Sequence, residues 1–360
     1  MRIVSLVGNR PQFVKAAAVS RRLRERHDEL LVHSGQHYDD ELSAVFFREL
    51  ELPAPDRRLG VGSGPNAEQV ARIMHAFEPE LEDWQPDLAV VYGDTNTTLA
   101  GALSCARIGV PLAHVEAGMR SFDWSMPEER NRVLADHVSD LCLCSTPIAV
   151  SNLDREGIGH SARLVGDVMA DVSLAMAPVA ERESDVLDRL GLGEASYLLL
   201  TVHRAGNVGR EEPLARLVEL LRRLPMRSVF PVHPRTRAAL ERLGALAELE
   251  ALEHLELIPP LGYLDFTKLL IHAAAVLTDS GGVQKEAYLA RVPCLTLRDT
   301  TEWTETVELG WNRLVGLDPD AVLEALGADP PPTHPELYGG GHAGDAIVAE
   351  LERFAERAIP

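Results

Sequence analysis

The stretch 113–132, AHVEAGMRSFDWSMPEERNR, gathers four carboxylates, three arginines and a histidine around the end of an apolar run typical of a buried strand. Glu116 ends this run, and the small residues after it leave room for a ligand. Glu128 has a structural alternative, because Ser125 three residues earlier would form an S-x-x-E capping box at a helix start. Glu116 and Glu128 flank one loop, so they could face the same pocket.

Asp94 occupies a comparable place in VVYGDTNTTLAG, after an apolar strand and before a helix. An aspartate there is often a helix N-cap, worth about 1 kcal/mol, and that is the structural alternative to catalysis. The expected proximity of Glu116 and Glu128 favours catalysis. Several carboxylates in one cleft raise each other's pKa, so that one can act as an acid while another stays a base. Asp94, Glu116 and Glu128 are therefore the predicted acid–base residues.

Arg10 and Lys15 lie in the stretch GNRPQFVK, around a predicted helix start. Backbone N–H groups, the positive end of the helix and two cations could hold a phosphate there. The alternative is an ordinary strand–helix turn with Pro11 in its first turn. The stretch lacks the G-x-G-x-x-G pattern, so we expect no dinucleotide cofactor.

Strand ends in the second half of the chain carry a further set of polar groups. His203 follows LLLTV and His233 follows FPV, with a purely structural histidine as the alternative at each position. The stretch LTDSGGVQKEA places two glycines before a helix whose first turns carry Glu286. Close backbone approach at the glycines and the donors of the helix N-terminus predict a diphosphate site, with Glu286 on a ribose. A glycine-rich N-capping turn without a ligand is the alternative.

Apolar runs alternate with amphipathic helical stretches along most of the chain, which predicts parallel sheets. The 360 residues exceed the length of about 250–300 at which a single core stops growing, so two domains are expected. We predict two doubly wound, Rossmann-like α/β domains facing a cleft, with ligands at the carboxyl ends of the strands. The expected boundaries are 1–166 for the acid–base domain, 167–345 for the nucleotide domain, and 346–360 for a closing helix that packs back on the first domain.

Composition narrows the classes of partner. A formal net charge of −20 repels phosphate backbones and anionic lipid, so neither nucleic acid nor a membrane is expected as a partner. No stretch reaches the length of about 20 apolar residues that crosses a bilayer, and the start lacks a secretory h-region, so a cytoplasmic location is expected. The four cysteines lack the paired spacing of a zinc site, so they are predicted to be reduced and buried, and no metal is expected.

Taken in order, the motifs resemble those of the non-hydrolysing UDP-N-acetylglucosamine 2-epimerases. The shared stretches are GNRPQFVKAAAV, SGQHYDDEL, VYGDTNTTLA, HVEAGMRSFDWSMPEERNR, TVHR, PVHP, LTDSGGVQKEA, RDTTEW and YGGGHA. The resemblance implies a fold similar to that of the GT-B glycosyltransferases. It also implies that UDP is eliminated across C1–C2 to give a 2-acetamidoglucal and then returns to C1, with a proton delivered to the opposite face of C2 and no cofactor.

The same resemblance implies a role for each residue singled out above. It makes the three carboxylates the acid–base groups and leaves open which of them removes which proton. It makes His203 a partner of the sugar or of the leaving diphosphate. The implied substrate contacts are the diphosphate at Arg10, Ser280, Gly281 and Gly282, the ribose at Glu286, the uracil face at Phe266, and further polar contacts at Lys15 and His233.

The chain departs from the common family pattern at several positions. Trp303 replaces an arginine expected near the diphosphate, and Gly340 replaces an aspartate in the closing motif. Tyr38 replaces an arginine, and Ala205 with Gly206 replaces an Arg-Glu pair. The last two changes argue against the regulatory second substrate site of many bacterial members.

These departures keep other substrates and other functions in view. Trp303 and its neighbours resemble the branch that acts on UDP-2,3-diacetamido-2,3-dideoxyglucuronate, which is the nearest rival substrate. A GT-B glycosyltransferase would use the same Glu286 loop but would need an acceptor site. A nucleotide-sugar-binding regulator would bind UDP without turnover. The family commonly forms dimers, so a homodimer that takes a UDP-sugar substrate is expected.

Overall fold

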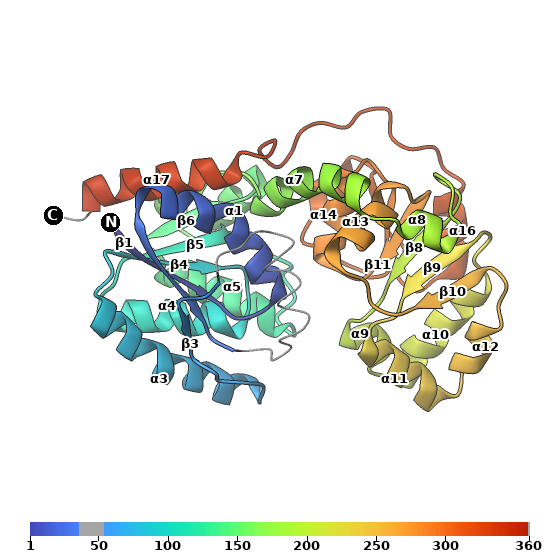
Figure 1. Cartoon of the computed structure of the whole chain (residues 1–360), viewed down its shortest axis with the longest axis horizontal. Coiled ribbons are helices and arrows are strands. Elements are labelled where there is room, and N and C mark those ends of the chain that lie inside the picture. The colour runs from blue at the N-terminus through green and yellow to red at the C-terminus, as the bar shows by residue number, and fades with distance from the viewer. Residues whose placement is uncertain (36–53, 359–360) are drawn as a thin grey trace. The chain divides into compact units, whose positions relative to one another are not determined.

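The computed structural model describes residues 1–35 and 54–358. Contacts divide the chain into two compact units, which are Met1–Val172 with Glu336–Pro360, and Ser173–Pro335. Each unit contains one parallel sheet with helices on both faces (Figure 1). The prediction of two doubly wound parallel-sheet domains is confirmed. Among the described helices, none is long and apolar enough to cross a membrane.

The first unit is built on a seven-stranded sheet in the order β3-β2-β1-β4-β5-β6-β7. The paired strands are parallel throughout, with Val4 opposite both Leu30 and Ala89 in the centre of the sheet. The strands are β1 (Arg2–Val7), β2 (Asp28–His33), β3 (Arg57–Arg58), β4 (Leu88–Tyr92), β5 (Leu112–Ala117), β6 (Leu141–Cys144) and β7 (Ala162–Leu164).

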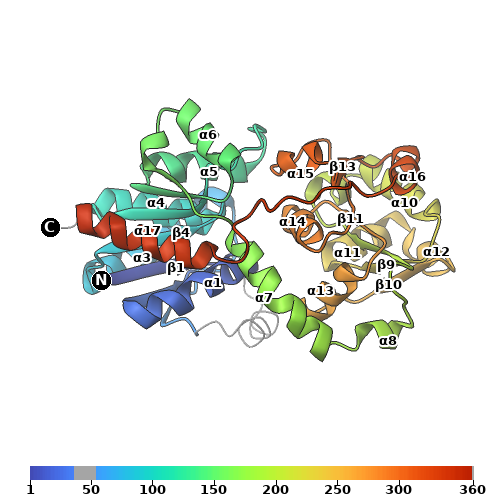
Figure 2. The same cartoon turned by 90° about the horizontal axis from the view of Figure 1, so that it is seen from above.

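Helices cover both faces of this sheet (Figures 1 and 2). On one face α3, α4 and α5 pack in a row, and on the other α1 packs against α17. The apolar side chains of α3 meet alternate residues of the central strands, which gives one of the buried cores. The helices are α1 (Arg10–Arg26), α3 (Asn66–Trp84), α4 (Asn96–Ile108), α5 (Pro127–Val138), α6 (Pro147–Arg155), α7 (Val168–Glu183) and α17 (Ala343–Ala358), with a 3-10 turn at Gly159–Ser161.

The closing helix α17 is tied to the first unit at its start. The buried carboxylate of Asp171 on α7 accepts hydrogen bonds from the backbone N–H groups of Ala343 at 2.9 Å and Gly344 at 2.8 Å. Arg22 of α1 pairs with Asp345 at 2.7 Å. The units therefore change over at 172/173 and 335/336, whereas the expected boundaries were 166/167 and 345/346. Helix α7 runs unbroken across the first of these boundaries.

The second unit repeats the plan with a six-stranded sheet in the order β10-β9-β8-β11-β12-β13. Its strands are β8 (Leu198–Thr201), β9 (Ser228–Pro231), β10 (Leu255–Ile258), β11 (Ala275–Thr278), β12 (Cys294–Thr296) and β13 (Asn312–Leu314). Its helices are α8 (Val186–Leu190), α9 (Ala205–Val208), α10 (Glu211–Arg222), α11 (Pro234–Leu243), α12 (Leu246–Glu250), α13 (Tyr263–Ile271), α14 (Gly281–Leu289), α15 (Thr304–Glu308) and α16 (Pro319–Leu326).

Alternation along the strands of this sheet creates two cores. Leu198 and Leu200 of β8 point to the core beneath α10 and α11, whereas Leu199 points to the core beneath α8 and α13. Successive side chains of a strand face opposite sides, so a strand buried on both faces must be apolar throughout. This is why the central strands could be recognised as continuous apolar runs.

Candidate functional site

The polar groups of the first unit meet at one edge of its sheet. Strands β1, β4 and β5 are neighbours and parallel, so the residues that follow them lie at the same edge. The strand order reverses between β1 and β4, which is the position where open α/β sheets hold ligands. One site at this edge of the sheet is therefore surrounded by the loop after β1, the turn at Asp94 and the end of β5 at Glu116.

Glu116 stands out at this edge because its backbone is strained. It has φ of +69°, and the β5–β6 pairing slips between Val115 and Ala117, so Glu116 is the extra residue of a β-bulge. Such a conformation costs about 1–3 kcal/mol in a residue other than glycine, and bulges re-aim side chains next to active sites. Here the Glu116 carboxylate pairs with the ammonium of Lys15 from α1, and both side chains are almost covered.

Gly93 makes room for this ion pair. It has φ of +64°, and a Cβ added there would lie 2.8 Å from Nζ of Lys15 and 3.5 Å from Oε2 of Glu116. The first distance is shorter than any ordinary contact, so a side chain at this position would displace the ammonium. The left-handed backbone favours glycine here, and the missing side chain leaves the Lys15 ammonium in its place beside Glu116.

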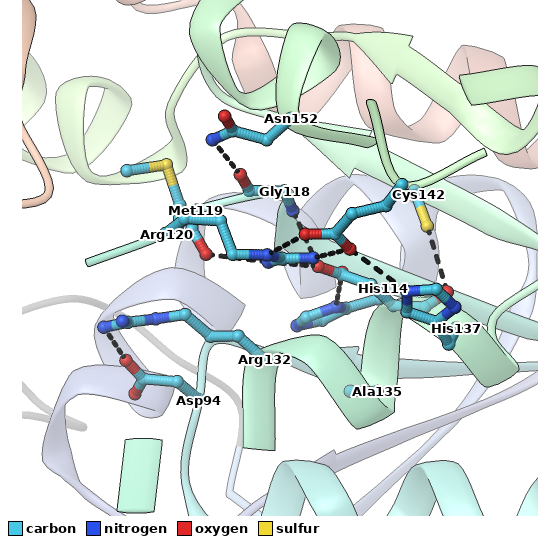
Figure 3. Close-up of polar contacts among 12 residues, drawn as sticks. Asp94, His114, Gly118, Met119, Arg120, Arg132, Ala135, His137, Cys142 and Asn152 are labelled. Carbon is cyan, nitrogen blue, oxygen red and sulfur yellow. Dashed lines mark hydrogen bonds and ion pairs between the residues drawn. The ribbon is translucent and has the colours of Figure 1, made fainter. Parts of the chain in front are cut away.

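Asp94 follows Gly93 and is free of the capping role that was its structural alternative. Thr95 is the N-cap of α4 and forms a reciprocal capping box with Thr98, so the N-cap interpretation of Asp94 is wrong. The Asp94 carboxylate instead binds Nη2 of Arg132 at 2.6 Å, as Figure 3 shows, and it keeps 28% of its side chain exposed. A partly exposed carboxylate beside the Lys15–Glu116 pair is within reach of a ligand.

Glu128 lies exposed on the first turn of α5. The expected capping box with Ser125 is wrong, because the N-cap is Met126 and Ser125 donates its hydroxyl to Asp123. The inward carboxylate on this turn belongs to the next residue, Glu129. Helix register decides which of two adjacent glutamates faces inward, and the sequence alone did not distinguish them.

Glu129 fastens the loop between β5 and α5. It accepts hydrogen bonds from the backbone N–H groups of Ser121 at 2.9 Å and Phe122 at 2.8 Å, and from Arg132 at 2.8 Å. Burial opposes the charge, but these donors outweigh it and lower the pKa of Glu129. Arg132 therefore bridges Glu129 to Asp94, and both residues were missed as parts of the site. The two carboxylates Asp94 and Glu129 share one guanidinium.

The start of α1 is a capped helix N-terminus, which both the predicted phosphate loop and an ordinary strand–helix turn would have. Asn9 is the N-cap and accepts from the N–H of Gln12 at 3.3 Å, with Pro11 in the first turn. Gln12 also accepts from the N–H of Gly8 at 2.8 Å, which closes the turn after β1. Arg10 is the first residue of the helix, and its side chain lies outside the described residues, as does Tyr38.

In the second unit His203 follows β8, next to the end of β11. Its ring lies 5.6 Å from that of His233, centroid to centroid. Asp279, fully buried at the end of β11, accepts from the backbone N–H of His203 at 3.1 Å and of Arg204 at 2.9 Å. Partial burial lowers the pKa of His203, and nearby arginines add to this while the Asp279 carboxylate opposes it. A neutral imidazole follows.

His233 has a structural duty as well, since it is the N-cap of α11. Its side chain accepts from the backbone N–H of Arg235 at 3.2 Å. The ring is therefore oriented by the helix that follows β9. The structural alternative raised for a histidine at the end of a strand is present here, alongside the contact with His203.

The SGG loop forms the start of α14, with Ser280 at the N-cap and Gly281 as the first helical residue. A Cβ on Gly281 would lie 3.4 Å from Nε1 of Trp303, so the indole lies against the loop. The ammonium of Lys285 sits 4.1 Å from the centre of the Trp303 ring, and both side chains are buried. A cation thus lies behind Trp303, in the region where the family pattern has an arginine.

Glu286 and Phe266 lie on neighbouring helices of the second unit. Glu286 of α14 lines a small cavity of ≈ 50 Å³ shared with Tyr263 of α13 and Ser173 of α7. Phe266, also on α13, packs against the adjoining apolar core. A cavity of this size has room for a water molecule or two.

Comparison with known proteins places this geometry in a family. The family model for UDP-N-acetylglucosamine 2-epimerase matches residues 21–352. The chain belongs to this family. It is 44% identical over 98% of its length to a UDP-N-acetylglucosamine 2-epimerase homolog from Methanococcus maripaludis, all of which is covered. The predicted family and enzyme class, a UDP-sugar 2-epimerase, are confirmed.

Two further relatives of the epimerase family bear on the substrate. The chain is 41% identical to UDP-2,3-diacetamido-2,3-dideoxy-D-glucuronate 2-epimerase from Pseudomonas aeruginosa, with 98% of this chain and 100% of the relative covered. The crystal structure of Methanocaldococcus jannaschii UDP-GlcNAc 2-epimerase in complex with UDP-GlcNAc and UDP superposes with a TM-score of 0.91 at 39% identity, covering 98% of this chain and 100% of that one. The GT-B-like epimerase fold predicted from the motifs is thereby confirmed.

Proposed function

We propose that the protein interconverts UDP-N-acetylglucosamine and UDP-N-acetylmannosamine. The observation that carries the proposal is the strained Glu116, paired with Lys15 and adjoining the Asp94 turn, in a chain whose relatives include UDP-N-acetylglucosamine 2-epimerases. Strain at a carboxylate next to a second carboxylate is what an acid–base site needs, because it fixes both groups relative to one sugar.

The chemistry of the substrate explains why acid–base groups are needed on two faces. The hydrogen at C2 is not next to a carbonyl, so it is not acidic enough for simple removal and return. A base takes the C2 proton while the C1–O bond breaks, and UDP leaves with the bonding electrons to give a 2-acetamidoglucal. In the return step a diphosphate oxygen forms the C1–O bond again and an acid delivers a proton to the opposite face of C2. The sum changes only the configuration at C2.

In our proposal, residues of the first unit remove the proton from C2 and deliver it again. Glu116 and Asp94 act as acid–base groups, and the ion pairs with Lys15 and Arg132 hold their carboxylates in place. Glu128 is the third acid–base residue, placed on the exposed first turn of α5.

The second unit holds the nucleotide in this proposal. The N-terminus of α14 faces the diphosphate with backbone donors, and neutral His203 contacts the sugar or the leaving group. The proposed contacts are the diphosphate at Arg10, Ser280, Gly281 and Gly282, the ribose at Glu286, the uracil at Phe266, and polar contacts from Lys15 and His233. UDP must stay bound between the two half-reactions, since its escape would make the enzyme a hydrolase.

Turnover in deuterated water tests the function. We expect deuterium at C2 of the product, and we expect Asp94→Asn and Glu116→Gln to abolish both turnover and label. The diacetamido-glucuronate nucleotide, assayed in parallel, is expected to turn over more slowly. If the diacetamido-glucuronate nucleotide turns over faster, it is the substrate in place of UDP-N-acetylglucosamine. Product without label would contradict the elimination route, as would transfer of the sugar to an acceptor.

We also propose a homodimer and a cytoplasmic location for the protein, because they fit the family to which it belongs. Light scattering of the purified protein should give a mass of about twice 39.4 kDa. Cell fractionation should leave the protein with the cytoplasmic markers. A monomeric mass at micromolar concentration would contradict the first proposal.

A further inference from the structure

His114 is a fully buried histidine that the mechanism above does not use. It lies on β5, two residues before Glu116, and its side chain has no exposed surface. In Figure 3 its ring lies beneath Arg120. Nε2 is 2.7 Å from the carbonyl oxygen of Gly93, and Nδ1 is 2.7 Å from Oδ1 of Asp136 on α5. Both ring nitrogens thus face oxygen atoms.

The number of donors required fixes the charge of this ring. A neutral imidazole has one N–H and one lone pair, whereas the protonated ring has two N–H groups. The Gly93 carbonyl can only accept, so Nε2 must donate. The other partner is ionised, because the second oxygen of Asp136 lies 2.7 Å from the permanently charged guanidinium of Arg120, and it also accepts from the N–H of Gly118 at 3.0 Å. An ionised carboxylate also only accepts, so Nδ1 must donate as well.

The environment of Asp136 agrees with this assignment. Burial disfavours its charge, but the hydrogen bonds and charges of His114 and Arg120 outweigh that penalty and lower the pKa of Asp136. The other charged group packed here is Glu156 at the end of α6, which binds Arg120 at 2.7 Å and His137 at 3.1 Å.

The remaining groups near the ring of His114 are either neutral or farther away, so they add no charge to the cluster of His114, Asp136, Arg120 and Glu156. On β6, Cys142 directs its thiol to the backbone oxygen of Asp136, and burial raises the pKa of that thiol to about 12. The Lys15–Glu116 and Arg132–Asp94 pairs lie beyond Gly93. Two cations and two carboxylates therefore balance within the cluster.

The contacts of His114 reach both acid–base turns. The Gly93 carbonyl belongs to the peptide that joins Gly93 to Asp94, so the Nε2 hydrogen bond sets the orientation of that peptide. Through Asp136 the ring is connected to the N–H of Gly118, two residues after Glu116. The carbonyl of Gly118 is held in turn by Asn152 at 2.9 Å, and Gly93 donates its N–H to Val115 at 3.0 Å.

We propose that His114 is a positioning residue protonated on both ring nitrogens, an imidazolium held by Asp136 that clamps the turns carrying Asp94 and Glu116. The consequence for catalysis rests on the proposed function, whereas the charge state does not. A fixed peptide at Gly93 keeps the two carboxylates at a constant separation through both half-reactions.

Nitrogen-15 NMR of the wild-type protein with labelled histidine tests the charge directly. At pH 8 both ring nitrogens of His114 should show imidazolium shifts, because each of them faces an oxygen that can only accept. The signal is assigned by its loss in His114→Gln. A neutral tautomer at pH 8 overturns the proposal, whether or not the protein turns over UDP-sugars.

Asp136→Asn tests the positioning role, with His137→Gln as the matched control on the same helix. The asparagine keeps the shape but removes the charge that holds the imidazolium, so the imidazolium NMR signal should disappear. We expect kcat to fall at least about 10-fold with KM changed less than about threefold, because small misplacements of catalytic groups act on the chemical step. Wild-type kcat in a folded Asp136→Asn protein overturns the role. If that variant does not fold, His114→Gln is measured in the same way, and wild-type kcat overturns the role there too.

Discussion

Replacing Gly93 by alanine should separate the catalytic importance of the Lys15–Glu116 pair from simple loss of stability. The new methyl carbon would lie 2.8 Å from the Lys15 ammonium nitrogen. An ordinary contact is about 3.6 Å, so the ammonium must retreat by about 0.8 Å. The left-handed backbone at φ +64° adds a cost of about 1 kcal/mol in unfolding free energy for any residue with a Cβ. Lysine is flexible, so the fold should survive while the ion pair is broken.

Gly109→Ala is the matched control for this change. Gly109 ends α4 with φ of +85°, and a Cβ there would meet open space among the described residues. The left-handed backbone should therefore cost both variants about 1 kcal/mol of unfolding free energy, measured by urea denaturation, and Gly93→Ala loses the ion pair in addition. Only Gly93→Ala should lose turnover, by about 10- to 100-fold in kcat, because a shift of this size at a catalytic group has that effect. Equal kcat values for the two variants would refute the argument that Gly93 is glycine for the sake of Lys15.

Three other predictions concern separate parts of the molecule. Asp171→Ala should lower the unfolding free energy by about 1–3 kcal/mol, because two buried N–H groups at the start of α17 lose their acceptor, and urea denaturation would reveal it. Protonation of His203 should make kcat/KM fall at acid pH. This fall should occur below the ordinary histidine pKa of about 6.5, because the lowered pKa of His203 keeps the ring neutral until the pH falls further. Arg235→Gln removes a charge that lowers this pKa, so the fall in kcat/KM should move to higher pH. Lys285→Met should weaken UDP binding about 10-fold in calorimetry, because the buried cation behind Trp303 is removed while the volume is kept; unchanged affinity would count against a role for that cation.

The central strands and the helices between them were predictable because local pattern and burial agree there. Strands such as β1 and β8 consist mainly of buried apolar residues, since helices cover both faces of their sheets. Short edge strands escaped prediction. β3, β7 and β13 have two or three residues each and carry arginines, so they show no apolar run, and only pairing with a longer neighbour makes them strands.

The candidate site was predicted in part. The sequence indicated Asp94, Glu116 and Lys15 because strand ends at one edge of a parallel sheet must converge. It did not indicate Arg132 or Glu129, since their importance depends on which side of α5 faces the Asp94 turn. A helix can be recognised from its period, but its rotation about its own axis is set by the packing of neighbours.

The sequence by itself determined the family, the doubly wound sheets and the kinds of acid–base group available, because these follow from residue types and their order along the chain. The tertiary structure alone decided that Glu116 is a bulged residue, that Gly93 must lack a side chain, and that His114 faces two acceptors. These features depend on contacts between residues more than 20 positions apart, such as the 21 positions between His114 and Gly93. Charge, strain and available space are properties of such contacts, and no single stretch of sequence contains both partners.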